Sequence, residues 1–320
     1  MPALLLVFFF VFGAIIGSFL NVLIHRLPLG ENFVFPRSRC PHCQKLIVWY
    51  ENIPLLSFAI LKGRCSSCQK QISWRYPFVE LLTGLAFVYF ASTQNVNASS
   101  FPLFLFQALV FSVLLVHFFI DWKHQILPDS LNFILGLAFG AYALIHFPWQ
   151  HWVFGIVVGA GFPLLVTWLF YLTRGQIGLG GGDIKLFGVL GIYLGPLFII
   201  HTIFLSCFAG AIYGGIAIAL KKMDKSKPLA FGPFIILVAL IQIFFPAFFA
   251  GLIFFNFWRK TPVGKPVFDK ITMNLPLFGS IIIKGNMASF TRTLSTMLSS
   301  GVALIDSLEI SVETIDHTYL

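Results

Sequence analysis

Two aspartates stand out in a chain that contains few acidic residues. Asp121 and Asp183 each lie where a hydrophobic run meets a short loop that carries Lys or Arg, and residues 1–258 hold only seven Asp or Glu. A carboxylate at the edge of a bilayer is costly to keep charged, so such residues usually have a chemical role. Two carboxylates that share one proton form the catalytic apparatus of an aspartic protease. We therefore predict that Asp121 and Asp183 act as a catalytic pair.

These acids also have structural interpretations. Asp121 can pair with Lys123, and Asp183 with Lys185, as ordinary interfacial charges. Asp129 stands where a helix is expected to start and can cap it, so its role is left open. The glycine run before Asp183 does not have the spacing of a phosphate-binding loop. Glycines allow a neighbouring helix or an extended substrate to approach the backbone closely, which favours the catalytic interpretation of Asp183.

Four cysteines form a second constellation, as two C-x2-C pairs with 21 residues between them: Cys40, Cys43, Cys65 and Cys68. Two such knuckles close a tetrahedral site suited to Zn²⁺. Two transient disulfides are the alternative, which a reducing compartment disfavours. His42 is a substitute ligand, but four thiolates already complete the site and leave no position for water. We predict a structural zinc that stabilises a loop of about 50 residues, and we expect Cys207 to serve only in packing.

The composition predicts a membrane protein. Hydrophobic residues make up 58% of the chain, charged residues 10%, and the mean hydropathy is +0.89. Apolar runs approach the length of about 20 residues that a spanning helix needs. The predicted fold is an all-α, polytopic membrane helical bundle of about eight spans, near 3–24, 78–92, 102–120, 130–147, 152–172, 186–200, 203–220 and 229–257.

Basic residues alternate between loops along the chain. They fall in loops 25–77, 121–129, 173–185 and 221–228, and the intervening loops have none. The positive-inside rule therefore places these four loops in the cytoplasm. The net charge of +9 follows from this topology and does not indicate nucleic-acid binding. The first run is expected to be an anchor with its N-terminus outside, since no cleavage site follows it.

Several motifs occur together in one order: Gly17-Ser-Phe-Leu-Asn-Val-Leu-Ile-His-Arg-Leu-Pro28, the two knuckles, Glu51-Asn-Ile-Pro54, Arg75-Tyr-Pro-Phe-Val-Glu80, Ile120-Asp121 through Leu127-Pro-Asp129, Gly180-Gly-Gly-Asp-Ile-Lys-Leu186 and Phe231-Gly-Pro-Phe234. Over about residues 10–245 this chain resembles the prepilin peptidases, or type IV leader peptidases.

The resemblance implies a bacterial inner-membrane enzyme whose active site faces the cytoplasm. Such an enzyme cleaves the basic leader of prepilins and pseudopilins with two aspartates, carried over to Asp121 and Asp183. It then methylates the new N-terminus with S-adenosylmethionine, an activity and cofactor expected from the resemblance alone. The implied domains are a first span over 1–25, a zinc-binding cytoplasmic loop over 26–77 and a peptidase membrane domain over 78–245.

The tail, 246–320, follows a different pattern. It resembles a fragment of the inner-membrane platform protein of type II secretion and type IV pilus machines, which would make those assembly proteins candidate partners. Met287, Phe290, Leu294 and Leu298 are expected on one face of a helix that ends at Ser300-Gly301, and a second helix is expected over about 304–315. A single span over 229–257 would carry the tail out of the cytoplasm. Four basic residues would then lie on the side that the positive-inside rule disfavours: Arg259, Lys260, Lys265 and Lys270. We hypothesise a fusion of two neighbouring genes, and an unrelated helical extension is the alternative.

Three other functions compete with a leader peptidase. A presenilin-like intramembrane protease would not explain the cysteine loop or the N-terminal motif. A non-enzymatic assembly subunit of a pilus or type II secretion system is the interpretation that the tail alone supports. A transporter can also use intramembrane acids as proton relays, but it would not need the cysteines.

Overall fold

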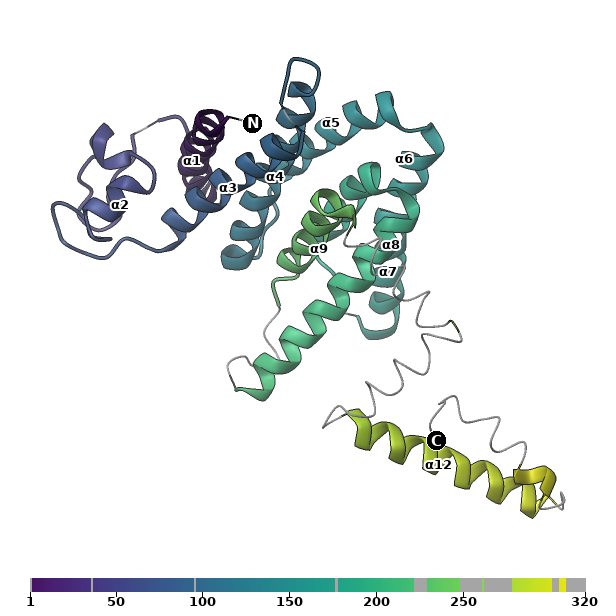
Figure 1. Ribbon diagram of the computed structural model, residues 1–320. Coiled ribbons are helices and arrows are strands. Elements are labelled where there is room, and N and C mark those ends of the chain that lie inside the picture. The colour runs from purple at the N-terminus through teal and green to yellow at the C-terminus, as the bar shows by residue number, and fades with distance from the viewer. Residues whose placement is uncertain are drawn as a thin grey trace. The chain divides into compact units, whose positions relative to one another are not determined.

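The computed structural model describes residues 2–35, 37–94, 96–175, 178–221, 229–247, 261, 278–300 and 305–308, and helices dominate it (Figure 1). The chain divides into two compact units, Met1–Phe244 and Phe245–Leu320. The all-α class predicted from the sequence is confirmed, because in the described ranges extended pairing is limited to two isolated bridges, Arg39 with Leu46 and Arg64 with Gln71.

The first unit begins with one long helix, continues through the cysteine loop and ends with the remaining apolar helices. The elements are α1 (Ala3–Arg26), η1 (Leu27–Leu29), η2 (Trp49–Asn52), α2 (Leu56–Ile60), α3 (Arg75–Gln94), α4 (Phe101–His124), α5 (Asp129–His146), α6 (Trp149–Ile156), the π-helical turn η3 (Val157–Gly161), α7 (Phe162–Arg174), α8 (Gly181–Ala219) and α9 (Gly232–Phe244).

Five helical stretches of the described chain are long and apolar enough to cross a membrane: Ala3–Leu29, Phe101–His124, Asp129–His146, Trp149–Arg174 and Gly181–Ala219. The expected count of about eight spans is therefore not confirmed. Helix α3 has 20 residues but is not among these five, and its first two turns carry the charged Arg75 and Glu80. Helix α9 covers only 13 residues of the expected run 229–257, and residues 248–257 of that run lie outside the described part.

Helix α8 is interrupted in its first half. The expected loop at 201–202 is wrong, because those residues are helical and the break lies at Gly195 and Pro196. Gly195 has φ 72° and ψ 177°, a conformation that glycine adopts readily and other residues do not. The ring of His151 lies beside Gly195, and its Nε2 is 3.1 Å from the carbonyl oxygen of Tyr193.

Close backbone contact joins the helices of the first unit. In Figure 1, α1 lies alongside α3, and a side chain added at Gly17 would lie 2.8 Å from the Cα of Glu80. Gly155 in α6 and Gly191 in α8 approach so closely that neither has room for a Cβ. Small residues at helix crossings are typical of membrane proteins, where packing drives association.

Helices α4 and α8 are the most buried of the candidate spans, and α9 packs against both. The core of α4 includes the fully buried Val110, Leu114 and Ile120. The two aspartates singled out in the sequence lie at the ends of these two central helices, so the best-packed elements of the molecule position them.

The second unit contains helix α12 (Phe278–Ser299), and residues 305–308 are also helical. Its end at Ser299 agrees with the stop expected at Ser300-Gly301. Met287 and Leu298 on the predicted apolar face are exposed. The rest of the second predicted helix and the four basic residues lie outside the described residues.

Candidate functional site

Asp121 lies in the last turn of α4 and is buried, with 5% of its surface exposed. The helix ends three residues later at His124, and Gln125 after it adopts a left-handed conformation with φ 54°. The main chain of Gly232, at the start of α9, faces the carboxylate. Its Oδ2 has no hydrogen-bond partner among the described residues. A buried carboxylate oxygen with an open position can hold a water molecule or a proton.

Asp183 lies in the first turn of α8, directly after the glycine run, and is half-buried. Gly180 is the residue before the helix, and its main chain faces Oδ2 of Asp183. The carboxyl group also lies close enough to Asp121 to be influenced by its charge. The structure therefore brings together two acids that are far apart in the sequence.

Neither aspartate forms the ion pair considered as its structural alternative. The described residues contain two ion pairs, Lys45 with Glu51 at 3.6 Å and Lys185 with Asp129. Nζ of Lys185 donates to both carboxylate oxygens of Asp129, at 2.8 and 2.9 Å.

Asp129 is therefore an exposed acid in the first turn of α5, and Pro128 takes the capping position. Its bond to Lys185 joins the loop after Asp121 to the start of α8, and Gly182 also lies against Leu127 of that loop. An exposed ion pair of this kind contributes about 1 kcal/mol or less.

The four predicted metal ligands come together in the cysteine loop. The sulfur atoms of Cys40, Cys43, Cys65 and Cys68 all lie within 4.8 Å of one another. Cys40 and Cys68 are 3.9 Å apart, and Cys43 and Cys65 are 4.0 Å apart, so they are thiols and not the alternative disulfides. A tetrahedral zinc with Zn–S bonds of about 2.3 Å needs S–S edges of about 3.8 Å, so the cluster fits a metal ion of this kind. His42 is exposed and outside the group, and Cys207 is exposed on α8.

The two knuckles repeat one backbone pattern. In each, the first cysteine N–H donates to the carbonyl of Lys45 or Lys70, at 2.9 Å, and a glutamine one residue after the second cysteine is left-handed, Gln44 with φ 58° and Gln69 with φ 57°. Both sequences read Cys-x-x-Cys-Gln-Lys, a repeat that the sequence analysis did not use. Backbone N–H groups of Cys68 and Ser67 lower the pKa of the Cys65 thiol to about 6, which favours the thiolate that binds metal. The pKa of the Cys68 thiol is raised to about 11, because burial and the neighbouring cysteines outweigh the backbone N–H of Lys70.

The cysteine loop is attached to the helices by Glu80 of α3. Its Oε2 accepts the backbone N–H of Leu55 at 2.8 Å, which fixes Leu55 in an unusual conformation with φ 61°. On the loop itself, Glu51 lies near Lys45, and a hydrogen bond from the Ser66 hydroxyl holds the pKa of the Glu51 carboxyl below its usual value. The loop therefore presents a charged carboxylate close to the knuckles.

The sequence analysis missed polar residues buried inside the apolar runs. His117 is fully buried one turn before Asp121, and its Nδ1 is 3.1 Å from the carbonyl oxygen of Val113. Its Nε2 and the side-chain amide of the buried Asn132 have no partner among the described residues. Ionisable and amide side chains within spans are costly, so their presence in an apolar run was a usable signal.

Two protein-family models match successive parts of the chain. Residues 11–93 match the model of the bacterial peptidase A24 N-terminal domain, and residues 108–215 match that of the type IV leader peptidase family. No solved structure matches the chain.

Curated relatives cover most of the chain. A prepilin leader peptidase/N-methyltransferase of Stutzerimonas stutzeri is 35% identical over an alignment of 256 residues, and the match covers 70% of this chain and 85% of that protein. Proteins of the same name from Aeromonas salmonicida strain A449 and Bacillus subtilis strain 168 are 37% and 34% identical, and the matches cover 73% and 70% of this chain and 88% of each relative. Two successive domain matches and relatives covered over most of their length therefore show that this multi-pass membrane protein belongs to the type IV leader peptidase family.

Proposed function

We propose that this protein removes the leader of prepilin-like substrates by an aspartic mechanism and then methylates the N-terminus that cleavage exposes. The single observation that supports it most is the meeting of Asp121 and Asp183, from the ends of two central helices, in a unit with few acids. The names of the relatives supply the substrate class and the second activity.

In this mechanism one aspartate is charged and the other is protonated. The charged carboxylate takes a proton from a water molecule, which attacks the scissile carbonyl carbon. The protonated partner donates to the carbonyl oxygen, and a proton then passes to the leaving amine nitrogen. Either aspartate can start as the base, because interacting carboxyl groups can exchange these two roles.

We assign Cys40, Cys43, Cys65 and Cys68 to a structural zinc ion. The four thiols complete a tetrahedral site and leave no open position, so the ion would stabilise the fold of the loop and take no part in hydrolysis.

We further propose that the enzyme lies in a bacterial inner membrane with both aspartates at the cytoplasmic side. The basic residues of loops 121–129 and 173–185 support this orientation. The leader of the substrate would then be cleaved before the rest of the chain is assembled into a pilus or a secretion pseudopilus. Assembly proteins of those machines are the expected partners.

The test uses the purified full chain, a prepilin and mass spectrometry to follow leader loss. Asp121→Asn and Asp183→Asn should each lower the cleavage rate by about 100- to 10,000-fold, because each removes one member of an acid–base pair. Asp129→Asn is the matched control at the same membrane edge. It should lower the rate by no more than about fivefold, since an exposed ion pair contributes about 1 kcal/mol or less. Normal cleavage by either of the first two variants would exclude the two-aspartate mechanism.

A further inference from the structure

Aromatic side chains from three helices meet at the end of α4. Phe118 and Trp122 of α4 are stacked, with ring centres 6.0 Å apart. The ring of Tyr213, in the second half of α8, lies 5.9 Å from that of Trp122 and 5.5 Å from that of Phe234 in α9. Aromatic rings attract one another at separations of about 4.5–7 Å. These four side chains therefore form one surface, which we call the aromatic surface.

The chain connects the aromatic surface directly to the catalytic centre. Trp122 follows Asp121, and Phe234 lies two residues after Gly232, whose main chain faces the Asp121 carboxylate. Successive residues of an extended peptide are about 3.3–3.6 Å apart. A substrate whose scissile bond lies at Asp121 therefore reaches the aromatic surface within a few residues.

The side chains of the aromatic surface are accessible and do not belong to the packed core. Trp122 is 51% exposed and Tyr213 is 42% exposed, while Phe118 and Phe234 are half-buried. Aromatic side chains offer a large apolar contact area at a low cost in conformational entropy. Next to a reactive centre, such a surface is suited to bind an apolar segment of a peptide.

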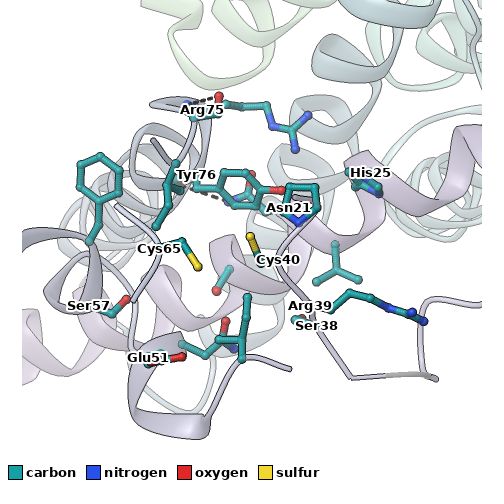
Figure 2. Close-up of a pocket in the computed structure, with 18 of the residues that line it drawn as sticks. Asn21, His25, Ser38, Arg39, Cys40, Glu51, Ser57, Cys65, Arg75 and Tyr76 are labelled. Carbon is teal, nitrogen blue, oxygen red and sulfur yellow. Dashed lines mark hydrogen bonds between the residues drawn. The ribbon is translucent and has the colours of Figure 1, made fainter. Parts of the chain in front are cut away.

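The other space next to Trp122 has a different character. Trp122 also lines a cavity of about 1300 Å³ between the cysteine loop and the ends of α1, α3 and α4. Figure 2 shows ionisable residues around that cavity: His25, Arg39, Glu51 and Arg75. Charged side chains keep their hydration, so an apolar segment would stay in contact with water there. An apolar part of a substrate is therefore expected on the aromatic surface and not in the cavity.

We propose that the aromatic surface binds the apolar substrate segment that lies on the membrane side of the scissile bond, and so holds that bond at the aspartates. This inference rests on the proposed peptidase function. Because both aspartates lie at the ends of candidate spanning helices, the part of a substrate that enters the bilayer must be apolar and helical. Its side chains would pack on the rings of Trp122 and Tyr213, a contact made equally in the bound substrate and in the transition state.

Aromatic residues at a membrane edge also serve as interfacial anchors. Tyr171 is a residue of that kind for comparison: it lies in the last turn of α7, before the basic loop 173–185, and is 54% exposed. An anchor contributes to membrane insertion and stability, whereas a docking surface contributes to the binding of substrate. Tyr213 and Tyr171 are therefore a matched pair that separates the two roles.

The first test compares the kinetics of prepilin cleavage by the unchanged full chain in detergent, Tyr213→Ala, Tyr213→Phe and Tyr171→Ala. We expect Tyr213→Ala to raise KM about tenfold with kcat within about twofold, because an aromatic contact made equally in ground and transition states is lost. Tyr213→Phe keeps the ring and should return KM to within about twofold of the unchanged chain. Tyr171→Ala should leave both constants unchanged. The melting temperature verifies that each variant is folded.

A second test detects the contact itself and does not depend on cleavage. The photoreactive p-benzoylphenylalanine replaces Tyr213 or Tyr171 in a full chain that also carries Asp121→Asn, so that bound prepilin stays intact. After ultraviolet irradiation, mass mapping should place the link from position 213 in the prepilin segment that follows the cleavage point. Position 171 should give no link to the prepilin.

Three results would overturn the inference: an unchanged KM in Tyr213→Ala, equal cross-linking yields from positions 213 and 171, or a link from position 213 that is absent or confined to the leader. Cleavage by the unchanged chain is measured in the same preparation. Failure of the peptidase assignment is therefore recognised separately from failure of the docking surface.

Discussion

At the scale of single residues, Gly232 determines how the first aspartate is placed. A Cβ at this position would lie 2.7 Å from Oδ2 of Asp121 and 3.0 Å from its Cγ, so any side chain would displace the carboxylate. We predict that Gly232→Ala lowers the rate of leader cleavage by about 100-fold, since a displacement near 1 Å can have that effect. The initial rate with a purified prepilin measures it.

Gly140→Ala is the control for this prediction. Gly140 lies in α5, and a Cβ there would meet nothing within 4 Å. Equal losses in the two variants would show that adding a methyl group to a helix, and not contact with the carboxylate, is responsible.

The residues of the site differ in how readily the sequence alone identifies them. Asp121, Asp183 and the four cysteines could be named in advance because each is a rare residue type for its surroundings or has a metal-ligand spacing. Gly232 could be assigned to a motif but not to a contact, because its role depends on α9 reaching α4. The hydrogen bond from the Asn21 amide of α1 to the carbonyl oxygen of Tyr76 in α3 joins two helices and could not be read from either one alone.

At the scale of elements, the cysteine loop depends on its metal. We predict that Cys43→Ser, or removal of zinc with a chelator, makes residues 38–72 accessible to protease, because a loop of this size has no sufficient core of its own. Limited proteolysis with mass mapping measures this. Cys207→Ser, which removes an exposed thiol on α8, should give the pattern of the unchanged chain. A loop that stays resistant after metal removal would contradict the structural role of zinc.

The crossing of α6 and α8 depends on the absence of a side chain at Gly155. Its position has no room for a Cβ against the carbonyl of Gly191, so Gly155→Ala should destabilise the protein by about 1–3 kcal/mol through overpacking. The melting temperature in detergent measures the loss. Gly161→Ala, where a Cβ would meet nothing within 4 Å, is the matched control. A similar drop in melting temperature in both variants would mean that close packing at this crossing does not limit the stability of the protein.

Element boundaries were predicted less well than element type. Apolar runs identified the helices because a bilayer requires continuous hydrophobic surface and internal hydrogen bonds. The break at Gly195 was missed because the surrounding run is apolar on both sides, and only the glycine–proline pair marks it. Helix α3 was expected as a span, yet it also forms the support for the cysteine loop through Glu80.

At the scale of the whole molecule, every residue of the proposed site lies in the unit Met1–Phe244, and the two family matches end at residue 215. We predict that truncation after residue 250 leaves leader cleavage within about twofold of the full chain, as expected when two compact units act independently. The mass assay on purified truncated protein measures it. Loss of cleavage would show that 251–320 contributes to the enzyme and would count against a passenger fragment.

The bond between Lys185 and Asp129 has a consequence for catalysis in solution. It is an exposed contact that joins the start of α5 to the start of α8, near Asp183. Dissolved electrolyte shortens the Debye length and screens such a contact. Added potassium chloride should therefore weaken this link between the starts of α5 and α8, and the rate of leader cleavage should change by no more than about fivefold, as in Asp129→Asn, even when the substrate carries no charge near its cleavage point.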